Sequence, residues 1–202
     1  MSAELLASIL VAGFGLGIIH ALDPDHLMTI ATLSASGDTK GSSLRQATLW
    51  ALGHGALLVA LAGAVAVAGV GLPAAVPAGA ERAVGFILIL TGASALWLRH
   101  PPHGHGTSLR ERAPLAVGMV HGLAGSGTML ALIPASLASP VIALLYAAIF
   151  SLGVLAGMMG FGLMLGKAHR QFEVHLPGAH RVARLALGTG AMAMGAYWLQ
   201  AG

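Results

Sequence analysis

Long apolar stretches separated by short polar segments dominate the chain. Six of them approach or exceed the roughly 20 residues that an α-helix needs to cross a bilayer. They run over Leu5–Ser34, Gln46–Leu72, Ala80–Leu98, Pro114–Leu137, Pro140–Leu165 and Val182–Leu199. The pattern predicts an all-α integral membrane protein with six transmembrane helices.

The first stretch is too long for one straight crossing. At about 1.5 Å per residue, a helix over Leu5–Ser34 would extend about 45 Å, against a hydrocarbon core of about 30 Å. Pro24 suits the first position of a helix, and Asp23 suits the N-cap before it. We therefore expect a break near Leu22–Asp23. Broken helices at mid-membrane are where transporters place their ion sites.

The two halves of the chain resemble each other. With a shift of 101 residues, Gly17–Leu22 recurs as Gly118–Leu123, and Ala95–Leu98 as Ala196–Leu199. An odd number of spans per repeat makes the two halves inverted in the membrane. We expect one transmembrane domain over 1–202, made of inverted three-helix repeats, each with its first helix broken. The repeats cover 1–98 and 114–202, and a His-containing cytoplasmic loop over 99–113 joins them.

The basic residues fall almost entirely on one side of this predicted topology. Nine of the ten Lys and Arg residues lie in the three loops after the first, third and fifth spans, and Arg82 alone lies on the other side. This asymmetry places both termini outside the cytoplasmic membrane. It also explains the isoelectric point of about 10.0 without nucleic acid as a partner. The absence of cysteine excludes disulfides and thiolate metal sites.

The candidate chemistry lies at the expected break. His20, Asp23, Asp25 and His26 fall within seven residues of an otherwise apolar run. Ionisable groups at membrane depth are costly and therefore point to function. Imidazole and carboxylate together suit divalent first-row transition metals. The alternative, with Asp23 only as an N-cap and His26 only as a packed imidazole, accounts for two of the four residues.

Other polar residues in the spans are weaker candidates. His54, between two glycines in the second span, is either a metal ligand or a packed core histidine. His121 corresponds to His20 in the second repeat, and either completes the site or bonds the broken backbone. Ser126 and Thr128 offer hydroxyl oxygens, although such hydroxyls often bond their own backbone.

The cytoplasmic loop between the repeats contains three histidines, His100, His103 and His105. Short His-rich tracts can collect metal ions, so a low-affinity metal antenna is one interpretation. A flexible linker is the other, since this spacing implies no fixed geometry.

Two of these motifs resemble a known family. His20-x4-Asp25-His26 and Leu52-Gly53-His54-Gly55 are similar to the signatures of the nickel/cobalt transporter (NiCoT) family and its short urease-accessory-type nickel permeases. The resemblance implies a nickel or cobalt permease whose signature helix runs from outside to cytoplasm. It also implies that His20, Asp25 and His26 select the substrate. Family members typically have eight spans, and Gly55 stands where a hydroxyl residue often follows Leu-Gly-His.

We therefore predict a secondary transporter, not an enzyme, that moves Ni²⁺ with Co²⁺ as a second substrate. No nucleotide-binding motif is present, so a gradient must drive transport. A dication entering the cell across 100 mV gains about 4.6 kcal/mol, which favours uptake. The alternatives are a nickel/cobalt exporter, an intramembrane metalloenzyme and a structural membrane partner in metalloenzyme maturation. Zn²⁺ shares the same ligands, the coupling ion stays open, and the small-residue faces permit a homodimer without requiring one.

Overall fold

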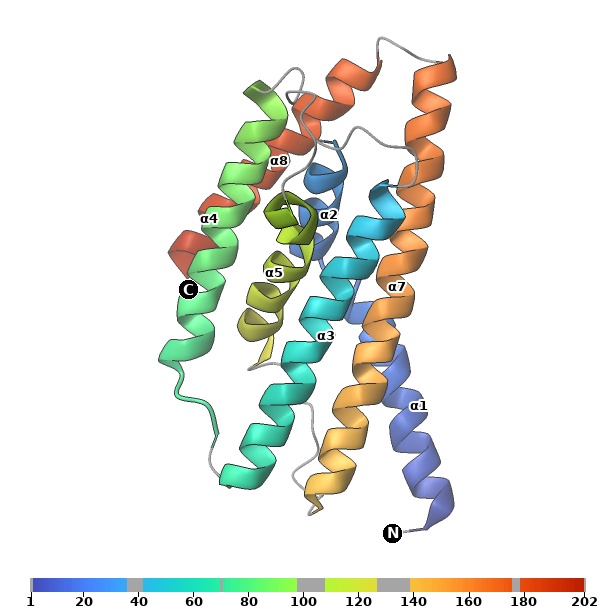
Figure 1. Cartoon of the computed structure of the whole chain (residues 1–202), viewed down its shortest axis with the longest axis vertical. Coiled ribbons are helices and arrows are strands. Elements are labelled where there is room, and N and C mark those ends of the chain that lie inside the picture. The colour runs from blue at the N-terminus through green and yellow to red at the C-terminus, as the bar shows by residue number, and fades with distance from the viewer. Residues whose placement is uncertain are drawn as a thin grey trace.

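The computed structural model describes residues 2–35, 42–69, 71–97, 108–126, 139–175 and 179–201. Every regular element in these ranges is helical. The helices are α1 (Ala3–His20), α2 (Pro24–Ala35), α3 (Ser42–Ala68), α4 (Ala75–Trp97), α5 (Ser108–Ala124), α7 (Pro140–His175) and α8 (Ala179–Ala201). They form an elongated bundle with the short helices α2 and α5 in its middle (Figure 1). The all-α prediction is confirmed.

The break in the first apolar stretch is confirmed. α1 ends at His20, whose carbonyl accepts a hydrogen bond from the Asp23 N–H at 3.1 Å. α2 begins at Pro24, which has no N–H to leave unpaired at a helix start. The Asp23 carbonyl accepts the first bond of α2, from the Leu27 N–H at 3.1 Å. The chain therefore interrupts its helix in the interior of the bundle.

The expected break in the second repeat stays a prediction. α5 ends at Ala124, inside the fourth apolar stretch, and the description stops at residue 126. Other boundaries differ from the apolar stretches because helices continue beyond the hydrocarbon. α7 runs on to His175, past Leu165, and α4 begins at Ala75, before Ala80. Hydropathy marks the part of a helix that suits lipid, whereas backbone hydrogen bonding sets where the helix ends.

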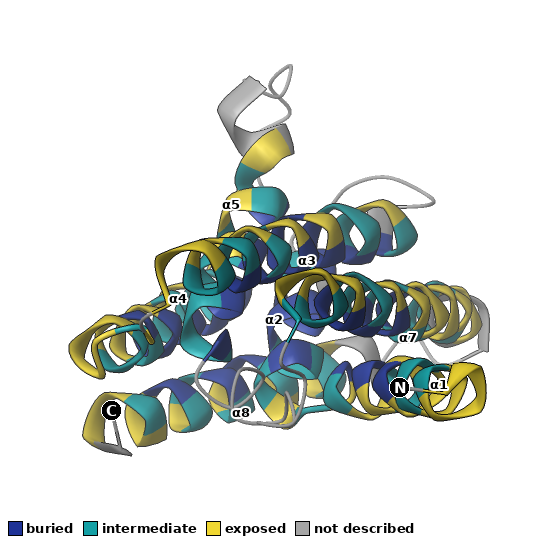
Figure 2. Ribbon diagram, turned by 90° about the horizontal axis from the view of Figure 1, so that it is seen from below, coloured by how far each residue is buried: buried dark blue, intermediate teal, exposed yellow. Residues whose placement is uncertain are grey.

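The outer surface of the bundle suits lipid. Exposed residues lie on the outward faces of the helices (Figure 2), and they include Val67 at 91% and Trp97 at 78% exposure. Four described helices, α1, α3, α4 and α7, are long and apolar enough to cross a membrane. α2 and α5 have only 12 and 17 residues. The prediction of six crossings therefore stays open for the remaining spans.

Glycines bring the long helices into backbone contact. Between α1 and α7, a Cβ on Gly17 would overlap the Phe150 carbonyl, and a Cβ on Gly153 would overlap the Phe14 carbonyl. No larger residue fits at either position without separating the helices. α1 and α7 therefore pack as a tight pair, although they come from opposite halves of the chain.

The same arrangement recurs between α3 and α5. A Cβ on Gly53 would overlap the Leu115 carbonyl, and a Cβ on Gly118 would overlap the Trp50 carbonyl. Leu115 and Gly118 lie 101 residues after their counterparts Phe14 and Gly17 on α1. The counterparts of the two α3 residues lie 100 residues later, on α7. Two glycine-packed pairs thus repeat one contact pattern.

α4 and α8 form a third pair. Cβ atoms on Gly85 and Gly92 would lie 2.7 Å and 2.6 Å from the carbonyl oxygens of Gly195 and Gly188. This pair has its own apolar cluster around Leu88, against which Met28 of α2 and Val120 of α5 also pack, and it is distinct from the larger cluster that α2, α3 and α7 build with Ala21. The interior is therefore divided into two parts.

Candidate metal centre

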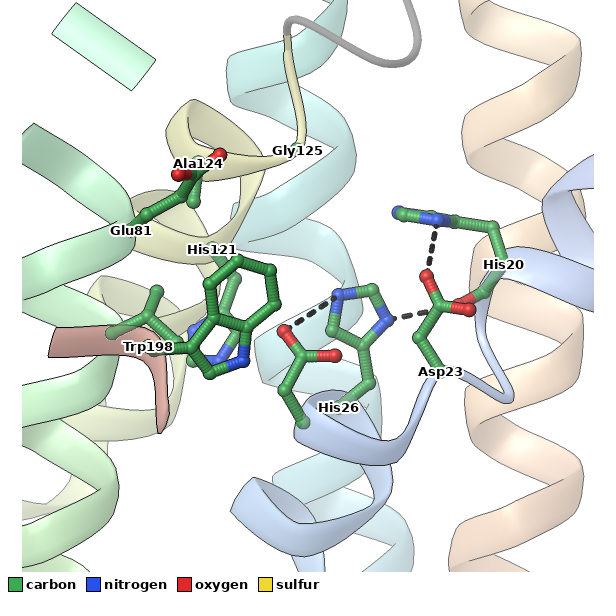
Figure 3. A pocket seen from close by; sticks show the side chains of 10 residues that line it. His20, Asp23, His26, Glu81, His121, Ala124, Gly125 and Trp198 are labelled. Atoms are coloured by element: carbon green, nitrogen blue, oxygen red, sulfur yellow. Dashed lines mark hydrogen bonds and ion pairs between the residues drawn. The ribbon is translucent and has the colours of Figure 1, made fainter. Parts of the chain in front are cut away.

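A cavity of about 110 Å³ opens at the break between α1 and α2. Its walls come from α1, α2, α4, α5 and α8, which bring residues distant in sequence to one place (Figure 3). The described lining residues are His20, Asp23, Asp25, His26, Glu81, Val84, His121, Ala124, Gly125 and Trp198. Three carboxylates and three imidazoles share this cavity, and none of its described lining residues is Lys or Arg. The composition favours a cation as its occupant.

His20 is held by the carboxylate of Asp23. Its Nδ1 lies 2.8 Å from Asp23 Oδ2, so the ring donates its Nδ1–H to the carboxylate. Nε2 is then the nitrogen with the free lone pair. That atom is buried and has no hydrogen-bond partner among the described residues. A carboxylate that orients an imidazole in this way is the usual support for a metal-ligating histidine.

The backbone at the helix break orients the His26 ring and fixes its tautomer. Its Nδ1 lies 3.0 Å from the His20 carbonyl oxygen, which can only accept a hydrogen bond. Nδ1 therefore carries the proton, and Nε2 keeps its lone pair. Nε2 lies 3.9 Å from Asp25 Oδ2, and the His26 side chain is 3% exposed. The carbonyl that fixes this ring is available because α1 ends at His20.

Three of the predicted residues can share one ion. Single ligand atoms of His20, Asp23 and His26 all lie within 4.8 Å of one another. Two donors about 2.1 Å from a common ion are at most about 4.2 Å apart, so placing all three on one ion would need side-chain rotations, and Asp23 would have to leave His20 Nδ1. Asp25, with a side chain 15% exposed, adds a carboxylate beside His26. Two nitrogens and carboxylate oxygens suit Ni²⁺, Co²⁺ and Zn²⁺.

His54 lies behind this cluster and does not line the cavity. Its ring is 5.5 Å from that of His20 and 5.3 Å from that of His26, between centroids. It stacks on Trp50 at 4.9 Å and is fully buried. Within the described part of the chain, neither ring nitrogen has a hydrogen-bond partner. Buried polar atoms without partners are rare, and this supports a ligand role over a satisfied core histidine.

His121 reaches the cavity from α5. Its Nδ1–H donates to the Val117 carbonyl at 3.0 Å, one turn earlier in the same helix, so this bond is not to the backbone of a helix break. Its Nε2 lies 3.1 Å from Thr29 Oγ1, which also lies 2.7 Å from the Asp25 carbonyl oxygen. One hydroxyl proton serves two acceptors. The His121 lone pair is therefore free whenever Thr29 donates to the carbonyl.

The remaining candidates lie apart from the cavity or outside the described residues. Ser126 donates to the Leu123 carbonyl at 2.7 Å. This is the bond to its own backbone that we gave as the alternative to a metal contact. Thr128 lies outside the described residues, and so do His100, His103 and His105.

Sequence reasoning missed Glu81 and Trp198 in the cavity lining, and Thr29 beside His121. Thr29 and Trp198 carry no charge, and only their tertiary contacts bring them to the site. Glu81 did give a signal, because it follows the first residue of the third apolar stretch. The cost of intramembrane charge, which singled out Asp23 and Asp25, applies to Glu81 as well.

Comparison with curated proteins gives one informative relative. Over 176 residues the chain is 30% identical to the urease accessory protein UreH of Bacillus sp. (strain TB-90), an alignment that covers 80% of this chain and 77% of that protein. The chain belongs to the nickel/cobalt transporter family, in its short urease-accessory branch. The resemblance of the two motifs is thereby confirmed, and this NiCoT protein is a membrane protein. No protein-family model and no solved structure matches the chain significantly.

Proposed function

We propose that this NiCoT protein is a secondary transporter that carries Ni²⁺, with Co²⁺ as a second substrate, into the cell across the cytoplasmic membrane. One observation carries the proposal: His20, Asp23 and His26 gather at a helix break inside the bundle, and the hydrogen bonds at Nδ1 leave each imidazole an Nε2 lone pair. The same residues could also bind a permanent structural metal. Transport is favoured here because the site lies in a NiCoT chain and borders an open cavity.

The side chains divide the work of binding. His20 and His26 supply nitrogen ligands, and Asp23 orients His20 by accepting its Nδ1 proton. Asp25 offsets the charge of the ion in surroundings that are otherwise apolar. His54, with two unpaired nitrogens behind these rings, is the next ligand along the path. His121 completes the coordination from the opposite repeat.

The packing supports inverted repeats that are interwoven. Glycine contacts repeat between the α1–α7 and α3–α5 pairs, as a pseudo-twofold relation between the halves requires. Each of these pairs joins one half of the chain to the other, so the halves cannot separate as two bodies. The α4–α8 pair has its own core and forms one wall of the cavity. We propose that this pair moves against the other helices to alternate access.

Flux measurements in proteoliposomes test the transport function. Protein reconstituted with a lumenal Ni²⁺-quenched dye should give saturable Ni²⁺ influx that increases with an inside-negative potential. His26→Ala should abolish it, because the cluster loses a nitrogen ligand, while His169→Ala on the distant end of α7 should leave it unchanged. Flux that survives His26→Ala would refute the site. A wild-type protein that holds Ni²⁺ without exchange and carries no flux would favour a metalloenzyme.

A further inference from the structure

Glu81 on α4 is a third carboxylate in the metal cavity. The structure describes four acidic side chains, Glu4, Asp23, Asp25 and Glu81, and all except Glu4 line this one cavity. Among the described lining residues no lysine or arginine offsets them. Two carboxylates already balance a dication, so a third needs a separate explanation. Its partial exposure leaves it accessible to water.

Glu81 lies at a different end of the cavity from α2. In Figure 3 its side chain lies beside Ala124, while α2 leads away from His26 in the other direction. α4 begins at Ala75, only six residues before Glu81, and the loop that precedes α4 is predicted to be outside. α2 leads to a loop that is predicted to be cytoplasmic. Glu81 therefore lies on the outer side of the cluster.

The space between Glu81 and His20 is kept open by a glycine. A Cβ on Gly125 would lie 3.6 Å from His20 Nε2, the buried nitrogen that has no partner among the described residues. Gly125 follows Ala124, which lies beside Glu81 (Figure 3). Glu81 and His20 therefore line the same cavity, with Gly125 beside the His20 ring.

Close packing fixes Glu81 relative to the cavity wall. One helical turn later, a Cβ on Gly85 would lie 2.7 Å from the Gly195 carbonyl oxygen and 3.1 Å from Trp198 Cβ. Trp198 itself lines the cavity. Glu81 and Trp198 therefore belong to one glycine-packed wall, the α4–α8 pair.

We propose that Glu81 is the capture residue of the transporter: it takes the dication from the outer solution and passes it to His20, Asp23 and His26. This inference rests on the proposed function. A single carboxylate holds a hydrated transition-metal ion weakly, whereas imidazoles bind it more firmly. In the transfer, a Glu81 oxygen leaves the ion as His20 Nε2 enters, with no change of oxidation state. A cavity lined by one sign of charge raises the local concentration of its counter-ion.

Kinetics of Glu81→Gln from each side of the membrane test the inference. In right-side-out vesicles, the KM for Ni²⁺ should rise about tenfold, because steering by one charge sign raises association by 10-fold or more. The maximal rate should stay within about twofold, since the cluster is intact. In inside-out vesicles the KM should not change. Higher ionic strength should raise the wild-type KM more than that of the variant.

Two further variants complete the design. Glu4→Gln removes an exposed carboxylate outside the cavity and should leave the KM at the wild-type value. Glu81→Asp keeps the charge and should restore most of the affinity, even if Glu81→Gln folds poorly. An unchanged outer KM, or an equal change from both sides, would overturn the capture role while leaving the transporter intact. Absence of saturable wild-type flux would instead overturn the proposed function itself.

Discussion

At the scale of single residues, hydrogen bonds decide which nitrogens can bind a metal. Asp23 and the His20 carbonyl each take the Nδ1 proton of one imidazole, so both rings keep an Nε2 lone pair. Free imidazoles exchange between tautomers, and only one of these presents Nε2 as a ligand. Asp23 is therefore more than the helix cap that its position before Pro24 suggests.

Asp23→Asn should weaken Ni²⁺ binding by about 10- to 100-fold, the range found when a partner of a metal-ligating histidine is lost. The amide oxygen still accepts the His20 proton, but it lacks the negative charge that makes the ring a stronger ligand. Equilibrium dialysis on the purified protein measures the change. In a His20→Ala background the same substitution should cost much less, because part of its effect acts through that ring. A dissociation constant within about twofold of wild type would rule out the orienting role of Asp23.

Much of the site could be predicted from the sequence, because it depends on residues close together in the chain. Pro24 and Asp23 predict the break from covalent geometry alone, and the cost of buried charge identifies the adjacent ionisable residues. The contact of Thr29 with His121 joins residues 92 apart in the chain, and no local pattern encodes it. Glu81 was missed for a different reason: next to Arg82 it resembles the polar edge of a span.

At the scale of helices, packing differs from what repeats in sequence suggest. Similar halves suggest two bodies that rock against each other about the site. Instead Gly17 and Gly118 tie α1 to α7 and α3 to α5, so each half is fastened to the other at backbone distance. Which helices pair is a tertiary property, and the spacing of glycines within one helix cannot specify it. In the proposed transport cycle, the helices that move are therefore α4 and α8.

Cross-linking should separate the moving pair from the fixed helices, and the absence of cysteine gives a clean background. A Cβ on Gly190 of α8 would lie 2.7 Å from Met28 Cε of α2, and a Cβ on Gly13 of α1 would lie 2.8 Å from Tyr146 Cε2 of α7. A short bis-methanethiosulfonate, which joins two thiols through reducible disulfides and releases sulfinate, should stop Ni²⁺ flux in Met28→Cys/Gly190→Cys until it is reduced. The matched Gly13→Cys/Tyr146→Cys pair should still transport when linked. If cross-linking stopped Ni²⁺ flux in both variants, or in neither, it would contradict the proposed movement of α4 and α8.

At the scale of the whole molecule, the metal cavity lies between the two apolar parts of the bundle. A large apolar cluster joins α2, α3 and α7, a smaller one joins α4 and α8, and the metal cavity is lined by residues of both parts. His20 and His26 belong to the larger part, whereas Glu81 belongs to the smaller. A relative displacement of the two parts would change access to the cluster without disturbing its hydrogen bonds.

Nickel K-edge X-ray absorption on the purified protein, loaded with one equivalent of Ni²⁺, tests most directly whether the ion binds at this cluster. We expect a shell of nitrogen and oxygen donors with the multiple scattering of at least two imidazoles. His26→Ala should remove one imidazole from that shell, and His169→Ala should leave it unchanged. A shell of oxygen donors without imidazole, or one that His26→Ala does not alter, would place the ion elsewhere and contradict the site.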